Sequence, residues 1–225
     1  MSPTLIFDLD GTLVDTAPDL LAALNIVLVG EGRRAVDRTD LGHLVGHGAR
    51  AMLVEAMTMT GEPAAPERLP ALIDAFIAHY RDHIADESRP YPGVEATLAR
   101  LAKSARLGVL TNKPQELAVP LLERLGLASW FRAIHGAGRF SYVKPDARVF
   151  HAVVDEVGGN GSGALMIGDS ATDVATARAA AVPVPVILLS YGYTPTPARA
   201  LAADLVIDRF SDLPEAIAIV LESAN

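Results

Sequence analysis

The chain has 225 residues, of which half are hydrophobic and a fifth are charged, so it can bury a substantial core and is not generally disordered. Its net charge of −8 argues against a nucleic-acid partner, and the absence of cysteine excludes disulfides, thiolate catalysis and cysteine-ligated zinc. The N-terminus has no signal-peptide pattern and no apolar run reaches membrane-spanning length. We therefore expect a cytoplasmic protein without a membrane partner.

The first predicted element is a short buried strand over residues 5–7, and two acids follow it at once. Asp8 and Asp10 are two residues apart, so on an extended backbone their side chains leave the same face. Gly11 then allows the backbone to turn tightly. Two carboxylates at the end of a buried strand are costly to desolvate together, and a divalent cation between them would offset that cost.

Residues 16–87 follow, and they show helical patterns without a strand pattern. A first helix is predicted to begin after Thr16, a suitable N-cap residue, and to present one apolar stripe. A second helical region is predicted over 39–59, with a break at the glycines of residues 46–48. A third is predicted after Pro66, where apolar residues recur at helical spacing.

The pattern changes at residues 90–93, Pro-Tyr-Pro-Gly, which form a strong breaker. Strands are then predicted over 107–111, 133–135, 164–168, 184–189 and 205–207, alternating with helices over 94–103, 114–126, 146–157, 171–181 and 213–221. Such alternation favours a parallel sheet covered by helices on both faces. The predicted fold is α/β: a doubly wound parallel-sheet core, residues 1–15 and 88–225, with an α-helical cap, residues 16–87, inserted after the first strand.

Polar residues gather where the predicted strands end, which is where open α/β sheets bind ligands. Thr111 and Asn112 end one strand, Asp169 and Ser170 follow another, and Lys144 precedes a helix. Together with the two acids of the first strand, this set has carboxylates for a hard cation such as Mg²⁺ and a hydroxyl and an ammonium for anionic oxygen. One acid remains to move a proton. The set fits phosphoryl transfer, which depends mainly on positioning and charge neutralisation.

Four segments of the chain resemble the motifs of the haloacid dehalogenase superfamily, in order and spacing, over nearly the whole chain. They are residues 8–16 (Asp-Leu-Asp-Gly-Thr-Leu-Val-Asp-Thr), 110–112 (Leu-Thr-Asn), 144–145 (Lys-Pro) and 168–173 (Gly-Asp-Ser-Ala-Thr-Asp). The helical insertion is similar to the superfamily's small α-helical cap. Within the superfamily, the chain most resembles phosphoglycolate phosphatases, on the segments 45–48, 91–94 and 191–193.

This resemblance implies catalytic roles for four residues. Asp8 would be the nucleophile that forms an aspartyl phosphate. Asp10 would protonate the leaving alcohol and then activate water. Thr111 and Lys144 would hold the phosphoryl oxygens.

The resemblance also implies a Mg²⁺ site. Asp8, the backbone carbonyl of Asp10 and Asp169 would ligate the ion. Asp173, one helical turn after Asp169, would support metal-bound waters or cap the helix, and the sequence leaves both roles open.

Specificity has to come from the cap or from loops that face it, because the core motifs recognise only phosphate and metal. The break at residues 46–50 is the candidate, since glycines permit close approach to a ligand and the helix that follows would present its N-terminus to an anion. A charged contact there would suit a small carboxylate such as that of glycolate. The alternative is that Arg50 is a solvated helix residue and the glycines are only a break. The expected substrate-binding residues are Gly11, Asn112, His47, Gly48 and Arg50.

The sequence thus predicts a Mg²⁺-dependent phosphatase acting on a small phosphorylated metabolite, with phosphoglycolate as the first candidate. A sugar phosphomutase of the β-phosphoglucomutase type would keep all four motifs, and another phosphometabolite would also be compatible with them. A phosphonate hydrolase would need a cap lysine, and the three lysines, Lys103, Lys113 and Lys144, lie outside the cap. A dehalogenase would need neither Asp10 nor a metal. A regulatory binding module that kept the fold would be free to lose the catalytic residues. No oligomeric state is predicted.

Overall fold

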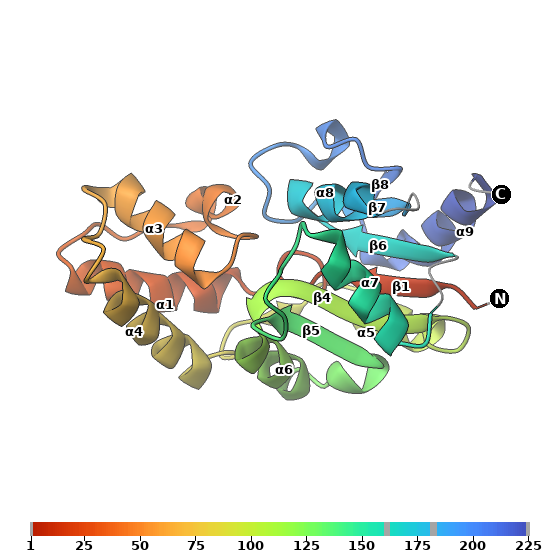
Figure 1. The fold of residues 1–225 in the computed structure, drawn as a ribbon, viewed down its shortest axis with the longest axis horizontal. Helices are drawn as coiled ribbons and strands as arrows, with labels where there is room; N and C mark the ends of the chain where they lie inside the picture. Colours follow the sequence, from red (N-terminus) through yellow and green to blue (C-terminus); the bar gives the residue numbers. More distant parts are fainter. Residues whose placement is uncertain (1, 160–162, 181–183, 224–225) are drawn as a thin grey trace.

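The computed structural model describes residues 2–159, 163–180 and 184–223, and it shows a helical part beside a layered core (Figure 1). The strands of the core are β1 (Thr4–Phe7), β4 (Arg106–Pro114), β5 (Ala133–Ala137), β6 (Ala164–Gly168), β7 (Val186–Leu189) and β8 (Leu205–Ile207). Its helices are α5 (Val94–Leu101), α6 (Gln115–Arg124), α7 (Ala147–Glu156), α8 (Ala171–Ala179) and α9 (Leu213–Ser223), with short 3₁₀ helices η2 (Ala128–Trp130), η3 (Ala198–Ala200) and η4 (Phe210–Asp212).

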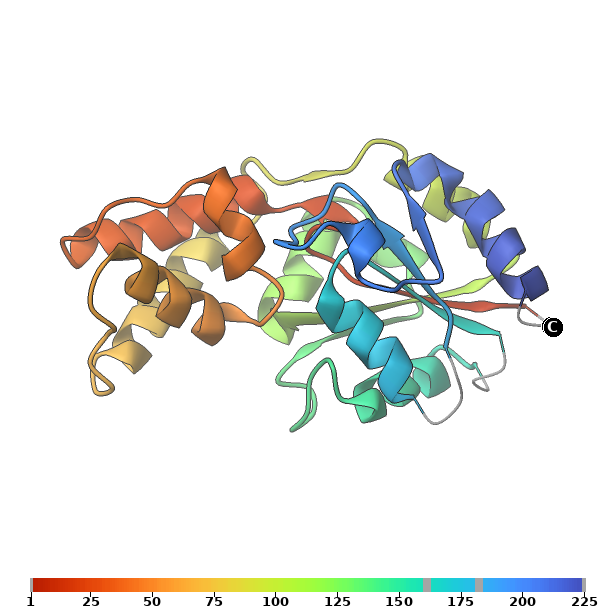
Figure 2. The ribbon, with the colours of Figure 1, turned by 90° about the horizontal axis from the view of Figure 1, so that it is seen from above.

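The core strands form one parallel sheet in the order β5-β4-β1-β6-β7-β8. Side chains alternate across it, as strand geometry requires. Leu5 and Phe7 of β1 belong to the apolar cluster that contains α5, α6 and α9, and Ile6 belongs to the cluster that contains α7 and α8. Figure 2 shows α5 and α9 on one side of the sheet and α7 and α8 on the other. The predicted doubly wound α/β fold is confirmed.

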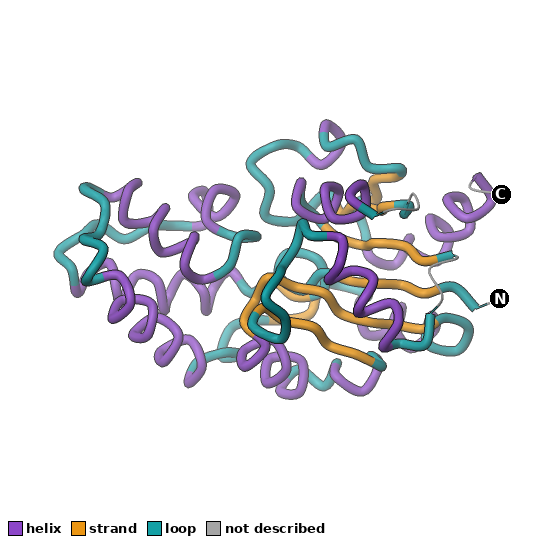
Figure 3. Tube along the Cα trace, in the orientation of Figure 1, coloured by secondary structure: helices purple, strands orange, loops and turns teal. Residues whose placement is uncertain are grey.

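The helical part comprises α1 (Ala17–Gly30), η1 (Arg38–Asp40), α2 (Leu41–Leu44), α3 (Ala49–Thr60) and α4 (Leu69–Asp82). Figure 3 shows it as helices and loops between β2 and β3, with no strand among its described residues. The predicted break falls between α2 and α3, and the backbone of Gly48 has a φ of 86°, a conformation that favours glycine. We call this part the cap, and the boundaries at residues 15/16 and 87/88 remain our interpretation.

The two chain crossings between core and cap form a small antiparallel pair that the sequence did not predict. β2 (Val14–Asp15) pairs with β3 (Arg89–Pro90). Each strand has only two residues and the partners are far apart in the chain, so no local sequence pattern predicts these strands. Thr16 precedes α1 as predicted, but its side chain does not cap the helix; Asp15 Oδ1 instead accepts a hydrogen bond from the backbone N–H of Ala17 at 3.3 Å.

Some element ends differ from the predictions by a few residues. β4 continues from 111 to Pro114, beyond the predicted end, and β7 begins at Val186 rather than at 184. α8 ends at Ala179, while residue 181, the predicted end, lies outside the described residues. Within the described part of the chain, none of the helices combines the length and apolarity that crossing a membrane requires.

Candidate active site

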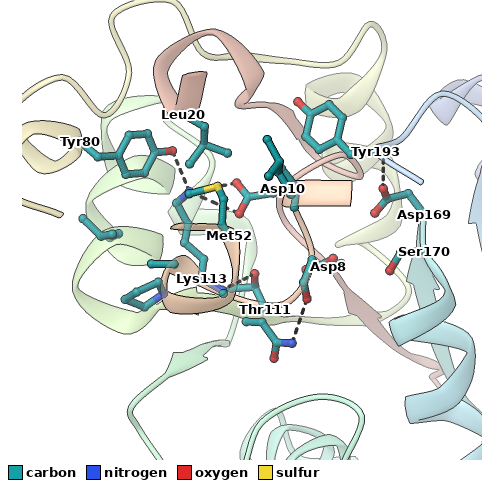
Figure 4. Close-up of a pocket in the computed structure, with 18 of the residues that line it drawn as sticks. Asp8, Asp10, Leu20, Met52, Tyr80, Thr111, Lys113, Asp169, Ser170 and Tyr193 are labelled. Carbon is teal, nitrogen blue, oxygen red and sulfur yellow. Dashed lines mark hydrogen bonds and ion pairs between the residues drawn. The ribbon is translucent and has the colours of Figure 1, made fainter. Parts of the chain in front are cut away.

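The predicted site residues come together at the carboxyl edge of the sheet. Asp8 follows β1, Thr111 lies in β4 and Asp169 follows β6, so three adjacent strands supply them. Lys144 comes from the loop between β5 and α7. All four residues are buried. Figure 4 shows Asp8, Thr111 and Asp169 around one cavity.

Lys144 bridges two carboxylates. Its Nζ lies 3.0 Å from Asp8 Oδ1 and 2.7 Å from Asp173 Oδ1. The Asn112 side chain fixes the lysine backbone, because its Oδ1 accepts from Lys144 N–H at 3.0 Å and its Nδ2 donates to the Lys144 carbonyl at 3.1 Å. Asn112 Nδ2 also donates to the carbonyl of Gly46 in the cap at 3.1 Å. Asn112 therefore positions Lys144 and ties the core to the cap, in addition to lining the cavity.

Asp169 is held at both oxygens. Thr12 Oγ1 donates to Oδ1 at 3.0 Å, and the backbone N–H of Tyr193 donates to Oδ2 at 2.8 Å. Gly11 makes this approach possible, since its φ is +81° and a Cβ there would lie 2.5 Å from Asp169 Oδ2. The structure thus places Gly11 against a carboxylate of the site.

Asp173 caps α8, which is one of the two roles that the sequence left open. Its Oδ2 accepts from the backbone N–H groups of Asp169 and Ser170 at 3.2 and 3.1 Å, and from Ser170 Oγ at 2.9 Å. Its Oδ1 meets Lys144. Because Asp173 is fully buried, these contacts are needed to offset the cost of removing its charge from water.

Three buried acids, Asp8, Asp169 and Asp173, form what we call the carboxylate cluster: one oxygen of each lies within 4.8 Å of the others. Burial raises the pKa of Asp8 to about 7, with Lys144 opposing and Asp173 adding to the shift. Burial, followed by repulsion from Asp173 and Asp8, raises the pKa of Asp169 well above its usual value. Burial lowers the pKa of Lys144, but Asp173 and Asp8 outweigh it and the net shift is upward. Hard oxygen donors that repel one another in this way fit a divalent cation such as Mg²⁺.

Asp10 faces a different lysine, whose place in the site the sequence analysis did not recognise. Lys113 Nζ lies 3.0 Å from Asp10 Oδ1 and 2.7 Å from the hydroxyl of Tyr80 in α4. Burial lowers the pKa of Lys113, and Asp10 opposes that shift. One signal was available: Lys113 is two residues after Thr111 on a strand, so both leave the same face. Tyr80 gave no such signal, because it reads as one more member of an apolar helix stripe.

The cavity lies between core and cap, has a volume of about 50 Å³ and is partly open to solvent. On the cap side it is lined mainly by apolar side chains: Leu20, Leu44, Val45, Met52 and Phe76. Gly46 and Gly48 also reach its wall. His47 and Arg50, the two charged contacts expected from the cap, are exposed and do not line it. The structure brings the glycines of the cap break to the cavity, but not these two side chains.

Comparison with known proteins identifies the class. Residues 5–187 match the model of the haloacid dehalogenase-like hydrolases, and the chain belongs to that family.

Over 221 residues it is 47% identical to a phosphoglycolate phosphatase of Caulobacter vibrioides, across 98% of this chain and 92% of that protein. It is 35% identical over 175 residues to an N-acetylmuramic acid 6-phosphate phosphatase of Pseudomonas aeruginosa, across 77% and 76%. A crystal structure described as a predicted phosphoglycolate phosphatase from Haemophilus somnus matches with a TM-score of 0.87 at 28% identity, covering 96% of this chain and 97% of that one. The resemblance inferred from the four motifs, to phosphoglycolate phosphatase-like hydrolases, is confirmed.

Proposed function

We propose that this hydrolase is a Mg²⁺-dependent phosphatase that cleaves a small phosphomonoester through an aspartyl phosphate on Asp8, with phosphoglycolate as the first candidate substrate. The observation that carries the proposal is the buried carboxylate cluster with Lys144 beside Asp8, at the wall of a cavity that also exposes Asp10. The names of the relatives support the reaction class, since both are phosphatases.

The carboxylates of Asp8 and Asp169 and the backbone carbonyl of Asp10 would hold Mg²⁺, with Asp173 as the neighbouring acid. When bound, the ion would neutralise charge shared between these carboxylates and a phosphate. The chain's own cation at this place, Lys144, is already balanced by two aspartates. A substrate phosphate therefore needs further positive charge here, which agrees with the fit of the donor set to Mg²⁺.

In the first chemical step a carboxylate oxygen of Asp8 attacks phosphorus and forms an acyl phosphate bond. The bond between phosphorus and the alcohol oxygen breaks, and Asp10, in its acid form, gives its proton to that oxygen. Lys144 and the hydroxyl of Thr111 bind the phosphoryl oxygens, where they stabilise the charge that is redistributed during transfer.

In the second step a water molecule attacks the phosphorus of the acyl phosphate. Asp10, now a carboxylate, accepts a proton from that water. The bond to Asp8 breaks, inorganic phosphate leaves, and both aspartates return to their starting states. The same residue serves as acid and then as base, so one side chain beside the leaving group suffices for both steps.

Phosphoglycolate and N-acetylmuramic acid 6-phosphate, the substrates in the relatives' names, are both phosphate monoesters that also carry a carboxylate, next to the ester carbon in the first and on a separate lactyl ether in the second. This shared chemistry supports a carboxylate-bearing substrate for this chain. Phosphoglycolate stands first because its relative covers nearly the whole chain at higher identity. The phosphate of a larger hydroxy acid is the second candidate, and it rests on the second relative.

The test is a phosphate-release assay on phosphoglycolate, N-acetylmuramic acid 6-phosphate and a sugar 1-phosphate, with Mg²⁺ and after exhaustive chelation. We expect release from phosphoglycolate that chelation abolishes and added Mg²⁺ restores. Undiminished release without the metal would contradict the metal requirement. Isomerisation of the sugar phosphate without phosphate release would contradict the phosphatase and favour a mutase.

A further inference from the structure

One buried lysine that lines the cavity is outside the phosphate-binding group proposed above. Lys113 comes from β4, and its side chain is 3% exposed. Its Nζ lies between Asp10, at 3.0 and 3.3 Å from the two carboxylate oxygens, and the Tyr80 hydroxyl at 2.7 Å. Its charge also lies over the Tyr80 ring, 4.4 Å from the centroid. Figure 4 shows this group on the side of the cavity away from Asp169 and Ser170.

The cavity walls offer an anion little positive charge: Lys144 of the proposed phosphate site is paired with Asp8 and Asp173 and is not among the lining residues. The acidic residues that line the cavity are Asp8, Asp10 and Asp169, and its cap side is mainly apolar. Of the side chains that line it, Lys113 is the one that carries a positive charge. His47 and Arg50, the cap residues that offered an alternative, are exposed and do not line it.

The place of Lys113 relative to Asp10 decides which part of a substrate it meets. In the proposed reaction Asp10 contacts the leaving alcohol oxygen, so an ammonium that touches Asp10 lies next to whatever the alcohol carries. In a 2-hydroxy acid phosphate the carboxyl carbon is bonded directly to the ester carbon. Its carboxylate would thus be close to Lys113 when the ester oxygen is beside Asp10.

The group can also donate hydrogen bonds to an entering carboxylate. A lysine ammonium has three N–H donors, and those of Lys113 face three acceptor atoms: both carboxylate oxygens of Asp10, at 3.0 and 3.3 Å, and the Tyr80 hydroxyl at 2.7 Å. The 3.3 Å contact is the longest of the three, so an entering carboxylate would take that N–H in place of Asp10 Oδ2. The Tyr80 hydroxyl accepts from Lys113, which leaves its own hydrogen for another acceptor. A carboxylate entering the cavity would find a charged donor and a hydroxyl donor side by side.

We propose that Lys113, positioned by Asp10 and by Tyr80 of the cap, is the residue that recognises a carboxylate on the leaving group of the substrate. This inference rests on the proposed phosphatase function and refines it to phosphomonoesters of short hydroxy acids. Tyr80 positions Lys113 and offers its hydroxyl hydrogen to the same carboxylate. Because it is delivered by α4, the recognition site is complete only with the cap seated on the core.

The experiment compares phosphoglycolate with its uncharged carboxamide, phosphoglycolamide, on the intact Mg²⁺-loaded enzyme. Wild-type kcat/KM should favour the carboxylate by at least about 10-fold. In Lys113→Gln we expect that ratio to fall about 10- to 100-fold, although both rates decline because Asp10 also loses its partner. Tyr80→Phe should lower the same ratio less and act mainly on KM. Lys103→Gln, a change at an exposed lysine in the turn after α5, is the control and should leave the ratio unchanged.

The outcomes separate this inference from the proposed function. A wild-type enzyme that hydrolyses both esters equally well would overturn the role of Lys113, whether or not the variants fold. So would an equal loss on both substrates in Lys113→Gln, which would show that the lysine serves Asp10 alone. Failure of the wild type to release phosphate from either ester would instead contradict the phosphatase itself.

Discussion

Asp8 and Asp10 are neighbours in the motif, and each contacts a different lysine. Asp8 meets Lys144 at 3.0 Å, inside the carboxylate cluster, and Asp10 meets Lys113 at 3.0 Å, toward the cap. In the proposed reaction, these different surroundings would suit the two carboxylates to two tasks: Asp8 would lie beside the phosphate and Asp10 beside the leaving group. Although the two acids are only two residues apart, after β1 and in the turn that follows it, their carboxylates contact different partners.

Changing Asp10 to Asn tests this division. The variant cannot donate a proton, so cleavage of an alkyl phosphate should slow by about 10²–10⁴-fold. An aryl phosphate, whose leaving group needs little protonation, should lose much less in the formation of the phosphoenzyme. Single-turnover kinetics on both substrates measures the difference. Equal losses on the two esters would argue against Asp10 as the acid.

Much of this site could be predicted at the residue scale because its signals are local. Asp8 and Asp10 have a same-face spacing, and Thr111 and Asp169 are polar residues that directly follow apolar runs of strand length. Tyr80 could not be found in this way, because its partner lies on another element and only the docking of the cap brings them together. The cap break reaches the cavity through its glycines and not through the side chains of His47 and Arg50, and a substrate contact there stays a prediction.

At the scale of elements, one buried acid joins α1 by hydrogen bonds to the segment at residues 87–88, where the chain leaves the cap. Asp19 in the first turn of α1 is 4% exposed, and its oxygens accept from the backbone N–H groups of Glu87 and Ser88 and from Ser88 Oγ, at 2.6 to 3.2 Å. These contacts hold the end of the cap insertion against its beginning, next to the β2–β3 pair. The long helices and strands were predictable from their periodicity, but this closure joins residues that no local pattern connects.

Asp19→Ala should therefore destabilise the fold. It leaves the buried polar groups of Ser88 without their acceptor, and the free energy of unfolding should fall by about 2–4 kcal/mol. Urea denaturation followed by circular dichroism measures the change. Asp74→Ala, at an exposed position of α4, is the matched control and should change it by less than about 0.5 kcal/mol. A loss no greater than the control's would show that the fastening is not needed.

For the whole molecule, core and cap share one apolar cluster. It runs from Phe7 and Val109 in the sheet to Leu53 and Phe76 in the cap. The carboxylate cluster lies at the edge of this apolar interior, where ionising each acid is costly. The protonation of these acids is therefore linked to the stability of the entire fold, and the binding of the proposed Mg²⁺ would be linked to it as well.

For Asp8, the direction in which pH changes the stability of the fold follows from the shift of its pKa. Its pKa is raised from 3.8 to about 7 on folding, so the folded state keeps a proton that the unfolded state has lost between those values. The stability that Asp8 contributes is complete below the lower value and is lost as the pH rises through the higher one. Without metal, Asp8→Asn should gain stability over the wild type by about 1–3 kcal/mol between about pH 5 and pH 8. Denaturant titrations of both proteins in chelator test this, and a difference that stays constant with pH would refute it.

The central claim is that Asp8 becomes phosphorylated during turnover. The direct measurement is to mix the Mg²⁺-loaded enzyme with phosphoglycolate, quench in acid within one turnover, and locate the phosphoryl group by peptide mass spectrometry. We predict a phosphoryl group on Asp8 in the wild type, and neither this adduct nor detectable turnover in a folded Asp8→Asn variant. Phosphate release at the full wild-type rate from Asp8→Asn, or a phosphoryl group on another residue, would contradict the account.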